Sequence, residues 1–174
     1  LVSFCFSYVT CPFVLDADGI NIVAENEKLK QMAYEKEQLV MTPHLKELAR
    51  FLGISVTDVK ENLSKVEQLL SGYKGILVAK DAKSLVVQEE KVCVSPFGSN
   101  AMATGGSGDV LTGILAGIYA QRKEYSKELL FKDTVAGVGI HGRCGEAAAE
   151  KLGVRAVLAR DIANAAADVI NTTF

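Results

Sequence analysis

The sequence lacks the cysteine and histidine pairs of a zinc site or a disulfide framework. It has only two histidines, and its four cysteines are scattered with no CxxC pair: Cys5, Cys11, Cys93 and Cys144. Closely spaced pairs are the usual sign of structural zinc and of disulfide-rich folds. We therefore expect free, buried thiols in a reducing compartment and no zinc site, while the residues that would contact any other metal stay unknown.

A surplus of positive charge is also missing. Nineteen Lys and Arg residues face 21 Asp and Glu residues, which gives a net charge of −2. Without a basic field, neither nucleic acid nor an anionic membrane is an expected partner. Any phosphate-bearing ligand must therefore be held by local groups.

The apolar opening, LVSFCFSYVTC, has no basic region and is too short to span a bilayer. We expect neither a signal peptide nor a membrane anchor there. Because the chain starts inside this apolar run without a capping residue, we expect it to be cut from something longer.

The length and composition fit one α/β domain over residues 1–174, with 49% hydrophobic and 23% charged residues. Short runs that are apolar on both faces predict buried strands of a mainly parallel sheet. We expect such strands at 12–17, 39–42 and 75–79, a hairpin from 85–87 and 92–95, and helices at 43–52, 55–73, 110–118, 132–152 and 159–170. Residues 26–38 are charged and favour a solvated helix or loop.

A glycine-rich stretch, NAMATGGSGDVLTGILAG at 100–117, is the most informative part of the chain. Gly105, Gly106 and Gly108 lack Cβ atoms, so the loop can adopt left-handed conformations and bring N–H groups close to a ligand. Helix-forming residues follow from Val110, which places the loop at a helix N-terminus. Unpaired N–H groups and the helix dipole attract anions there, and phosphate is the expected ligand.

Asp109 introduces a carboxylate beside this predicted phosphate cradle. Such a carboxylate is repelled by phosphate unless a proton or cation intervenes. It could act as a base that takes a proton from a hydroxyl while the N–H groups stabilise the attacked phosphoryl group. The alternative is an acidic residue that only stabilises the first turn of the helix.

Other candidate residues follow the predicted strands, at the edge where open α/β sheets bind ligands. Asp16 and Asp18 could touch a substrate or hydrated magnesium, or only cap a turn. His44 lies in the first turn of the next helix, for which Thr42 is the expected N-cap and Pro43 the first helical residue.

A second polar segment, Lys80, Asp81, Ala82, Lys83 and Ser84, follows the strand at 75–79. It is either a nucleotide-binding loop or an exposed charged loop. In the Gly/Ala-rich helix at 132–152, the glycines favour close packing on a neighbour, for which the helix of Asp109 is a candidate, and a structural role is favoured for His141.

Several of these segments together resemble one family. ATGGSGDVLTGILAG is similar to the anion-hole motif of the ribokinase-like superfamily and, within it, of the NAD(P)H-hydrate dehydratases. It is not a P-loop, since no Gly-Lys-Ser/Thr ends it. LDAD (15–18), TPHxxE (Thr42, Pro43, His44 and Glu47) and the lysine segment stand in the family's order, and the likeness runs from about Pro12 to the C-terminus. Gly19 and Asp81 depart from the family pattern, which has a small apolar residue and a glycine there.

The resemblance implies a ribokinase-like three-layer α/β/α fold with a mainly parallel sheet, incomplete at the N-terminus. It implies a cytoplasmic lyase that repairs hydrated NADH or NADPH, with ADP or ATP as co-substrate, Mg²⁺, and a possible homo-oligomer. The implied site residues are Asp109 as base and substrate contact; Gly106, Ser107 and Gly108 as anion hole; Lys80, Asp81, Ala82, Lys83, Ser84 and Gly108 for the nucleotide; and His44 for the hydrate. Glu47 is expected to fix local structure.

Two other functions stay open at this point. The superfamily also contains small-molecule kinases that share the GxGD loop and an aspartate base. Alternatively, the chain is an inactive remnant, or a module for binding or assembly.

Overall fold

The computed structural model describes residues 1–173, so residue 174 of the predicted domain lies outside the described part. The chain divides into two compact units. Unit 1 comprises residues 1–81 and 85–93, and unit 2 comprises residues 82–84 and the chain from Val94 onward. Over residues 1–173, no helix combines the length and the apolar character that crossing a membrane requires.

Unit 1 is built around a five-stranded sheet with the strand order β1-β2-β3-β4-β5. The strands are β1 (Phe13–Leu15), β2 (Leu39–Met41), β3 (Ile76–Ala79), β4 (Leu85–Gln88) and β5 (Lys91–Val94). The β1–β2 and β2–β3 pairs are parallel, and β3–β4 is antiparallel. Every residue of β2 and β3 is buried, as their apolar character on both faces predicts. The mainly parallel α/β sheet and the hairpin are thus confirmed.

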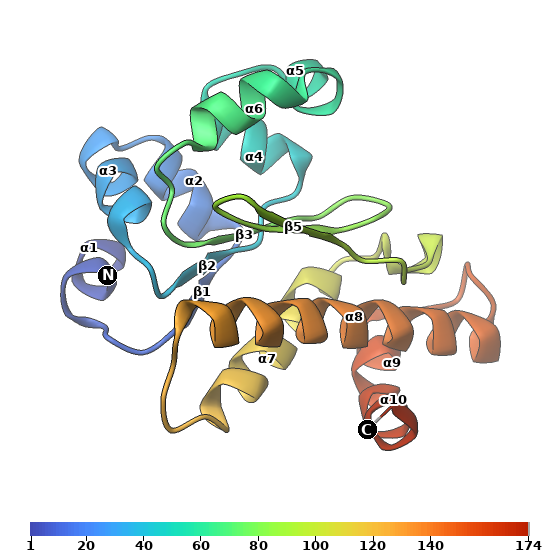
Figure 1. Cartoon of the computed structure of the whole chain (residues 1–174). Coiled ribbons are helices and arrows are strands. Elements are labelled where there is room, and N and C mark those ends of the chain that lie inside the picture. Colours follow the sequence, from blue (N-terminus) through green and yellow to red (C-terminus); the bar gives the residue numbers. More distant parts are fainter. Residues whose placement is uncertain (174) are drawn as a thin grey trace. The chain divides into compact units, whose positions relative to one another are not determined.

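Helices α1 to α6 complete unit 1. Their bounds are α1 (Val2–Tyr8), α2 (Asp18–Ala24), α3 (Glu27–Glu35), α4 (Leu45–Leu52), α5 (Val56–Glu61) and α6 (Leu63–Leu70). Helix α2 packs against α3 and α4, and helices α2 to α6 gather on one side of the strands (Figure 1). Buried side chains from α1 to α5 and from β2 and β3, such as Ile20, Phe51 and Met41, form one core, and partly buried side chains of α6 pack against it.

The single helix expected at 55–73 is wrong, because α5 ends and α6 begins at Asn62. The Asn62 side chain accepts a hydrogen bond from the Lys65 N–H at 3.3 Å and so caps a new helix. The predicted start is correct, since Ser55 and Asp58 form a capping box. The predicted end of the preceding helix is also correct, since Gly53 caps α4 with φ of 71°.

Unit 2 is built on the long helix α8 (Lys127–Leu152), which begins at its Ser126 cap, before the expected start at residue 132. The other elements are the 3₁₀ helix η1 (Asn100–Met102), α7 (Ser107–Ala120), α9 (Ala159–Asn164) and α10 (Ala166–Thr173). Helices α7, α9 and α10 pack against α8 (Figure 1). The single helix expected at 159–170 is therefore two helices.

A glycine brings α7 and α8 close together, as the Gly/Ala-rich pattern predicts. A Cβ atom at Gly137 would lie 2.6 Å from Leu115 Cδ2, so a larger residue would have to displace the Leu115 side chain of α7. Polar contacts join the same two segments near the turn between them. Tyr119 and Thr134 hydroxyl oxygens lie 2.7 Å apart, and the Arg122 guanidinium donates two hydrogen bonds to Asp133.

The four cysteines are free, as expected, but their burial differs. Cys144 is buried, Cys5 and Cys93 are half-buried, and Cys11 is exposed. Burial raises the pKa of the Cys144 thiol. The expectation of four buried thiols therefore holds only for Cys144.

Candidate functional site

The glycine-rich loop ends in a left-handed residue at the start of α7. Gly106 is the N-cap with φ of 89°, and a Cβ atom there would lie 3.0 Å from Ala159 Cβ. Both the backbone conformation and the close approach favour glycine. The helix begins at Ser107, before the expected Val110, which places Gly108 and Asp109 in its first turn.

Backbone donors gather at this helix start. The N–H groups of Gly106, Gly108 and Asp109 have no hydrogen-bond acceptor within residues 1–173, as is normal for the first turn of a helix. The Ser107 N–H instead donates to the Thr104 carbonyl oxygen at 3.3 Å. An anion at this point would therefore meet several unpaired N–H groups and the positive end of the α7 dipole.

Asp109 is exposed in this first turn. Its Oδ2 atom would lie 3.9 Å from a Cβ atom built on Gly106, so the carboxylate is close to the loop backbone. The carboxylate and the free N–H groups thus occupy one short segment. This arrangement can hold an anion and accept a proton from a group beside it.

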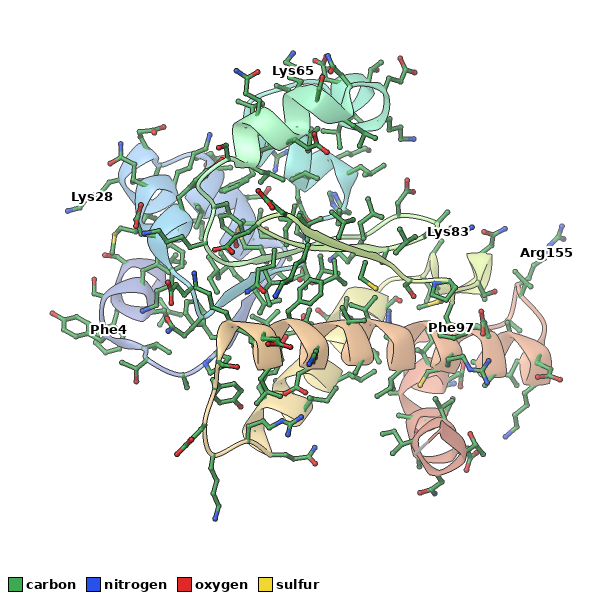
Figure 2. The ribbon with its side chains drawn as sticks, in the orientation of Figure 1. Phe4, Lys28, Lys65, Lys83, Phe97 and Arg155 are labelled. Carbon is green, nitrogen blue, oxygen red and sulfur yellow. The ribbon has the colours of Figure 1, made fainter. Side chains whose placement is uncertain are left out.

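The loop that leads to this segment rests on α8. A Cβ atom at Gly142 would lie 2.8 Å from the Phe97 carbonyl oxygen, and the Glu146 carboxylate accepts the Gly98 N–H at 3.0 Å. The Arg143 guanidinium lies 5.1 Å from the centre of the Phe97 ring, which Figure 2 shows beside α8. The Gly-rich face of α8 therefore fixes the approach to the glycine loop.

Residues 82–84 of the predicted lysine segment belong to unit 2 and lie beside the residues that lead to the glycine loop. The Ser95 N–H donates to the Ser84 carbonyl oxygen at 2.9 Å. Ala82 and Lys83 are exposed, and the Lys83 side chain extends outward (Figure 2). Lys80 and Asp81 belong to unit 1, so the segment is divided between the units.

In unit 1, polar side chains collect where β1, β2 and β3 end. The Lys80 N–H donates to the Pro43 carbonyl oxygen at 2.8 Å, and His44 and Lys80 form an isolated parallel bridge. The Lys80 ammonium donates to Asp16 Oδ1 at 2.7 Å. The sheet thus brings Asp16, His44 and Lys80 to its carboxyl edge, where α/β sheets bind ligands.

Ala17, between Asp16 and Asp18, has a strained backbone with φ of 49° and ψ of −121°. Its N–H donates a hydrogen bond to Asp16 Oδ1 at 2.9 Å. The same oxygen accepts the hydrogen bond from the Lys80 ammonium. Asp18 is exposed in the first turn of α2. A non-glycine residue in such a conformation costs about 1–3 kcal/mol and is most common at functional sites.

His44, not Thr42, is the N-cap of α4. His44 Nδ1 accepts the Glu47 N–H at 3.1 Å, and the Glu47 carboxylate accepts the His44 N–H at 2.8 Å. The expectation that Glu47 fixes local structure is confirmed by this capping box. The Thr42 cap is wrong because its N–H continues the sheet to the Leu15 carbonyl oxygen, and its buried hydroxyl has no hydrogen-bond partner within the described chain.

Sequence reasoning did not find two contacts that bear on these segments. The Asp16–Lys80 pair joins residues 64 positions apart. The Ser107 hydroxyl lies 3.4 Å from His141 Nε2, which joins the start of α7 to the middle of α8. The Gly/Ala-rich pattern of α8 predicted its close packing, but no local pattern indicated either pair.

Comparison with solved structures places the chain in the ribokinase-like class of folds. A protein from Streptococcus mutans superposes with a TM-score of 0.77 at 25% identity, covering 92% of this chain and 55% of that one. A ribokinase-like superfamily protein from Enterococcus faecalis gives a TM-score of 0.74 at 23% identity, covering 92% and 52%. An ADP/ATP-dependent NAD(P)H-hydrate dehydratase from Bacillus subtilis, co-crystallized with ATP/Mg²⁺, gives 0.77 at 22% identity, covering 93% and 55%.

The NAD(P)H-hydrate dehydratase family profile matches residues 3–167, and the chain belongs to this family. A bifunctional NAD(P)H-hydrate repair enzyme from Coxiella burnetii is 39% identical over 153 residues, which cover 87% of this chain and 29% of that protein. An ADP-dependent (S)-NAD(P)H-hydrate dehydratase from Neisseria meningitidis is 34% identical over 158 residues, covering 89% and 52%. The chain therefore spans between about a third and a half of the length of these relatives.

Proposed function

We propose that this chain carries the catalytic segment of a nucleotide-dependent NAD(P)H-hydrate dehydratase, a lyase that restores NADH or NADPH from their hydrated forms. The observation that carries this proposal is the start of α7. There the exposed Asp109 carboxylate and the unpaired N–H groups of Gly106 and Gly108 lie in one turn, in a chain that belongs to the dehydratase family.

The first chemical step is phosphoryl transfer to the hydroxyl of the hydrated nicotinamide ring. Asp109 accepts the hydroxyl proton while the oxygen attacks the terminal phosphoryl group of the nucleotide. An O–P bond forms to the substrate and the bridging P–O bond breaks, so that ADP leaves as AMP, or ATP as ADP. The Gly106 and Gly108 N–H groups stabilise the charge on the phosphoryl oxygens.

The second step eliminates the phosphate that the first step attached. The ring C–O bond breaks and phosphate departs with its electron pair. The neighbouring carbon loses a proton to solvent as the double bond of NADH or NADPH forms again. Phosphorylation is needed because hydroxide is a poor leaving group and phosphate a good one. The same N–H groups at α7 would stabilise the departing phosphate.

The carboxyl edge in unit 1 supplies the other proposed contacts. His44 is half exposed, with 53% of its side chain accessible, and its imidazole would contact the hydrated nicotinamide nucleotide. Lys80 and the segment from Asp81 to Ser84 would contact the adenine nucleotide. Asp81 adds a negative charge, which the exposed Lys83 would offset, whereas the Lys80 ammonium is already paired with Asp16.

Magnesium fits this site as a companion of the nucleotide. Residues 1–173 contain no group of three or more His, Cys, Asp or Glu side chains able to hold a metal ion. Proteins often bind Mg²⁺ through one or two carboxylates together with substrate phosphates, so Asp109 is the carboxylate that could contribute. When bound, the ion would screen the repulsion between Asp109 and the phosphates.

The free thiols fit a reducing, cytoplasmic compartment, where these nucleotides are used. The test of the proposed function is turnover of enzymatically prepared NADH hydrate with ADP or ATP plus magnesium. NADH absorbance and free phosphate are followed together, and the dehydratase produces both in equal amounts. If this chain is silent, the same assay on a chain extended upstream distinguishes a fragment that needs the rest of its domain from a protein without this activity.

A small-molecule kinase of the same superfamily is the alternative, because the GxGD loop and an aspartate base serve kinases equally well. A kinase leaves the transferred phosphate on its product, so the nucleotide would be consumed without release of phosphate. A chain that binds no adenine nucleotide, alone or extended upstream, would instead be a binding or assembly module.

A further inference from the structure

Ser107 and His141 form a buried polar pair between α7 and α8. Ser107 Oγ lies 3.4 Å from His141 Nε2, and the two residues are only 7% and 8% exposed. Gly137 lies one turn before His141 on α8 and allows the close approach of α7 through Leu115. The packing of two helices therefore fixes the imidazole beside the first residue of the anion-binding turn.

The hydroxyl is the hydrogen-bond donor of Ser107 that remains available to an anion. Its backbone N–H already donates to the Thr104 carbonyl oxygen, whereas the N–H groups of Gly106 and Gly108 have no acceptor within residues 1–173. A serine hydroxyl has one hydrogen and two acceptor lone pairs. The direction of that single hydrogen decides whether Ser107 attracts or repels a phosphoryl oxygen.

The tautomer of His141 sets this direction. If Nε2 lacks a proton, the Ser107 hydroxyl donates to it and turns a lone pair toward the anion. If Nε2 carries the proton, it donates to Ser107 Oγ and leaves the hydroxyl hydrogen for another acceptor. Only the second arrangement suits an anion hole.

We propose that His141 is a positioning residue: its Nε2–H donates to Ser107 Oγ and directs the hydroxyl hydrogen toward the phosphoryl group. The identity of the phosphoryl compound rests on the proposed function, whereas the contact between Ser107 and His141 does not. It assigns a role to a histidine for which the sequence favoured only a structural one. The chemistry of the ligand is a phosphoryl group, whichever nucleotide carries it.

The tautomer can be measured without any activity. The chain has only two histidines, so ¹⁵N NMR of wild-type protein and of His44→Gln assigns the His141 ring at alkaline pH, where imidazole is neutral. The proposal expects protonated Nε2, with a shift of that signal in Ser107→Ala. A ring protonated on Nδ1, or a signal unaffected by Ser107→Ala, would overturn it.

Kinetics then test the role in the reaction. We expect Ser107→Ala to lower kcat on the order of 10²-fold and His141→Ala about 10-fold, with the KM for the hydrate unchanged. In the double variant, His141→Ala should add no further loss, and His141→Gln should restore kcat because its Nε2 can donate in the same place. Losses that multiply, or no rescue by glutamine, would contradict a positioning role.

A matched control separates catalysis from packing. Tyr119→Phe removes another buried α7–α8 hydrogen bond, the 2.7 Å contact with Thr134, and should lower stability without a change in kcat. If the protein has no turnover, either as this chain or extended upstream, but binds ADP, the proposed function fails, and the same set of variants is then compared by their affinity for ADP. Coupled losses of affinity would then support the pair, and independent losses would reject it.

Discussion

The Lys80 ammonium lies 2.7 Å from Asp16 Oδ1 and so joins the end of β3 to the end of β1. The two side chains are 23% and 13% exposed, so solvent screens this ion pair less than a surface pair. Asp16 Oδ1 also accepts the N–H of the strained Ala17. The pair therefore fixes a lysine at the edge where a nucleotide is proposed to bind.

Asp16→Asn should lower the free energy of unfolding by about 1–3 kcal/mol, because it leaves a partly buried ammonium without its charged partner. Asp18→Asn is the control, since Asp18 is exposed in the same segment. Urea unfolding measures both. Equal effects of the two substitutions would show that the ion pair makes no specific contribution to the free energy of unfolding.

His44 combines a cap with a proposed substrate contact, and two substitutions separate these roles. His44→Ala should cost about 1 kcal/mol of stability through loss of the cap of α4. His44→Asn should recover that stability, since asparagine is a strong N-cap, but should not recover turnover of the hydrate. Thermal unfolding and the dehydration assay give the two readings. Full activity of the Asn variant would remove His44 from the substrate site.

The buried strands and the helix ends of unit 1 could be predicted because their signals are local. Strands β2 and β3 are apolar on both faces, and Gly53 ends α4 because it accepts a left-handed conformation. The break at Asn62 escaped prediction because the apolar spacing continues through it, while the asparagine side chain ends one helix and caps the next.

The candidate site could be predicted only in part, for a similar reason. Glycines and an aspartate at a helix start indicate an anion site by themselves, which led to Gly106 and Asp109. The contacts of Lys80 with Asp16, and of His141 with Ser107, join residues far apart in the chain. Their existence depends on sheet order and helix packing, which local patterns do not specify.

Gly142 should not tolerate alanine. The new Cβ atom would lie 2.8 Å from the Phe97 carbonyl oxygen, a backbone atom, so the approach to the glycine loop must shift. We expect a loss of about 1–3 kcal/mol in stability. Gly139→Ala is the matched control, with 3.9 Å to the Phe97 ring, and should gain up to about 1 kcal/mol from helix propensity. Thermal unfolding of both variants tests this, and similar shifts in the two would contradict it.

Stability should fall at alkaline pH because of buried phenols. Burial raises the pKa values of Tyr73 and Tyr119 above the ordinary 10.0. Below pH 10 the phenols are protonated in both states and have no effect. Above it the unfolded chain releases protons that the folded chain retains, so stability falls by about 1.4 kcal/mol per pH unit per phenol.

Urea unfolding across this range, with Tyr73→Phe, measures the effect, and the variant should show a smaller slope. Phe51→Leu is the control in the same aromatic cluster, with rings 6.4 Å apart. It should lower stability equally at every pH because it removes no ionisable group. An unchanged slope in Tyr73→Phe would show that burial of this phenol does not cause the loss of stability at alkaline pH.

The most direct test of the central claim is formation of NADH from its hydrate by wild-type protein, Asp109→Asn and Asp109→Ala, with ADP or ATP plus magnesium, in the shortest chain that is active. We expect nucleotide-dependent NADH formation that falls by about 10²–10⁴-fold in both variants, because the base that accepts the hydroxyl proton is gone. Adenine nucleotide binding should persist, since the N–H groups at α7 remain. Turnover within a few-fold of wild type in Asp109→Asn would contradict the assignment of this carboxylate as the base.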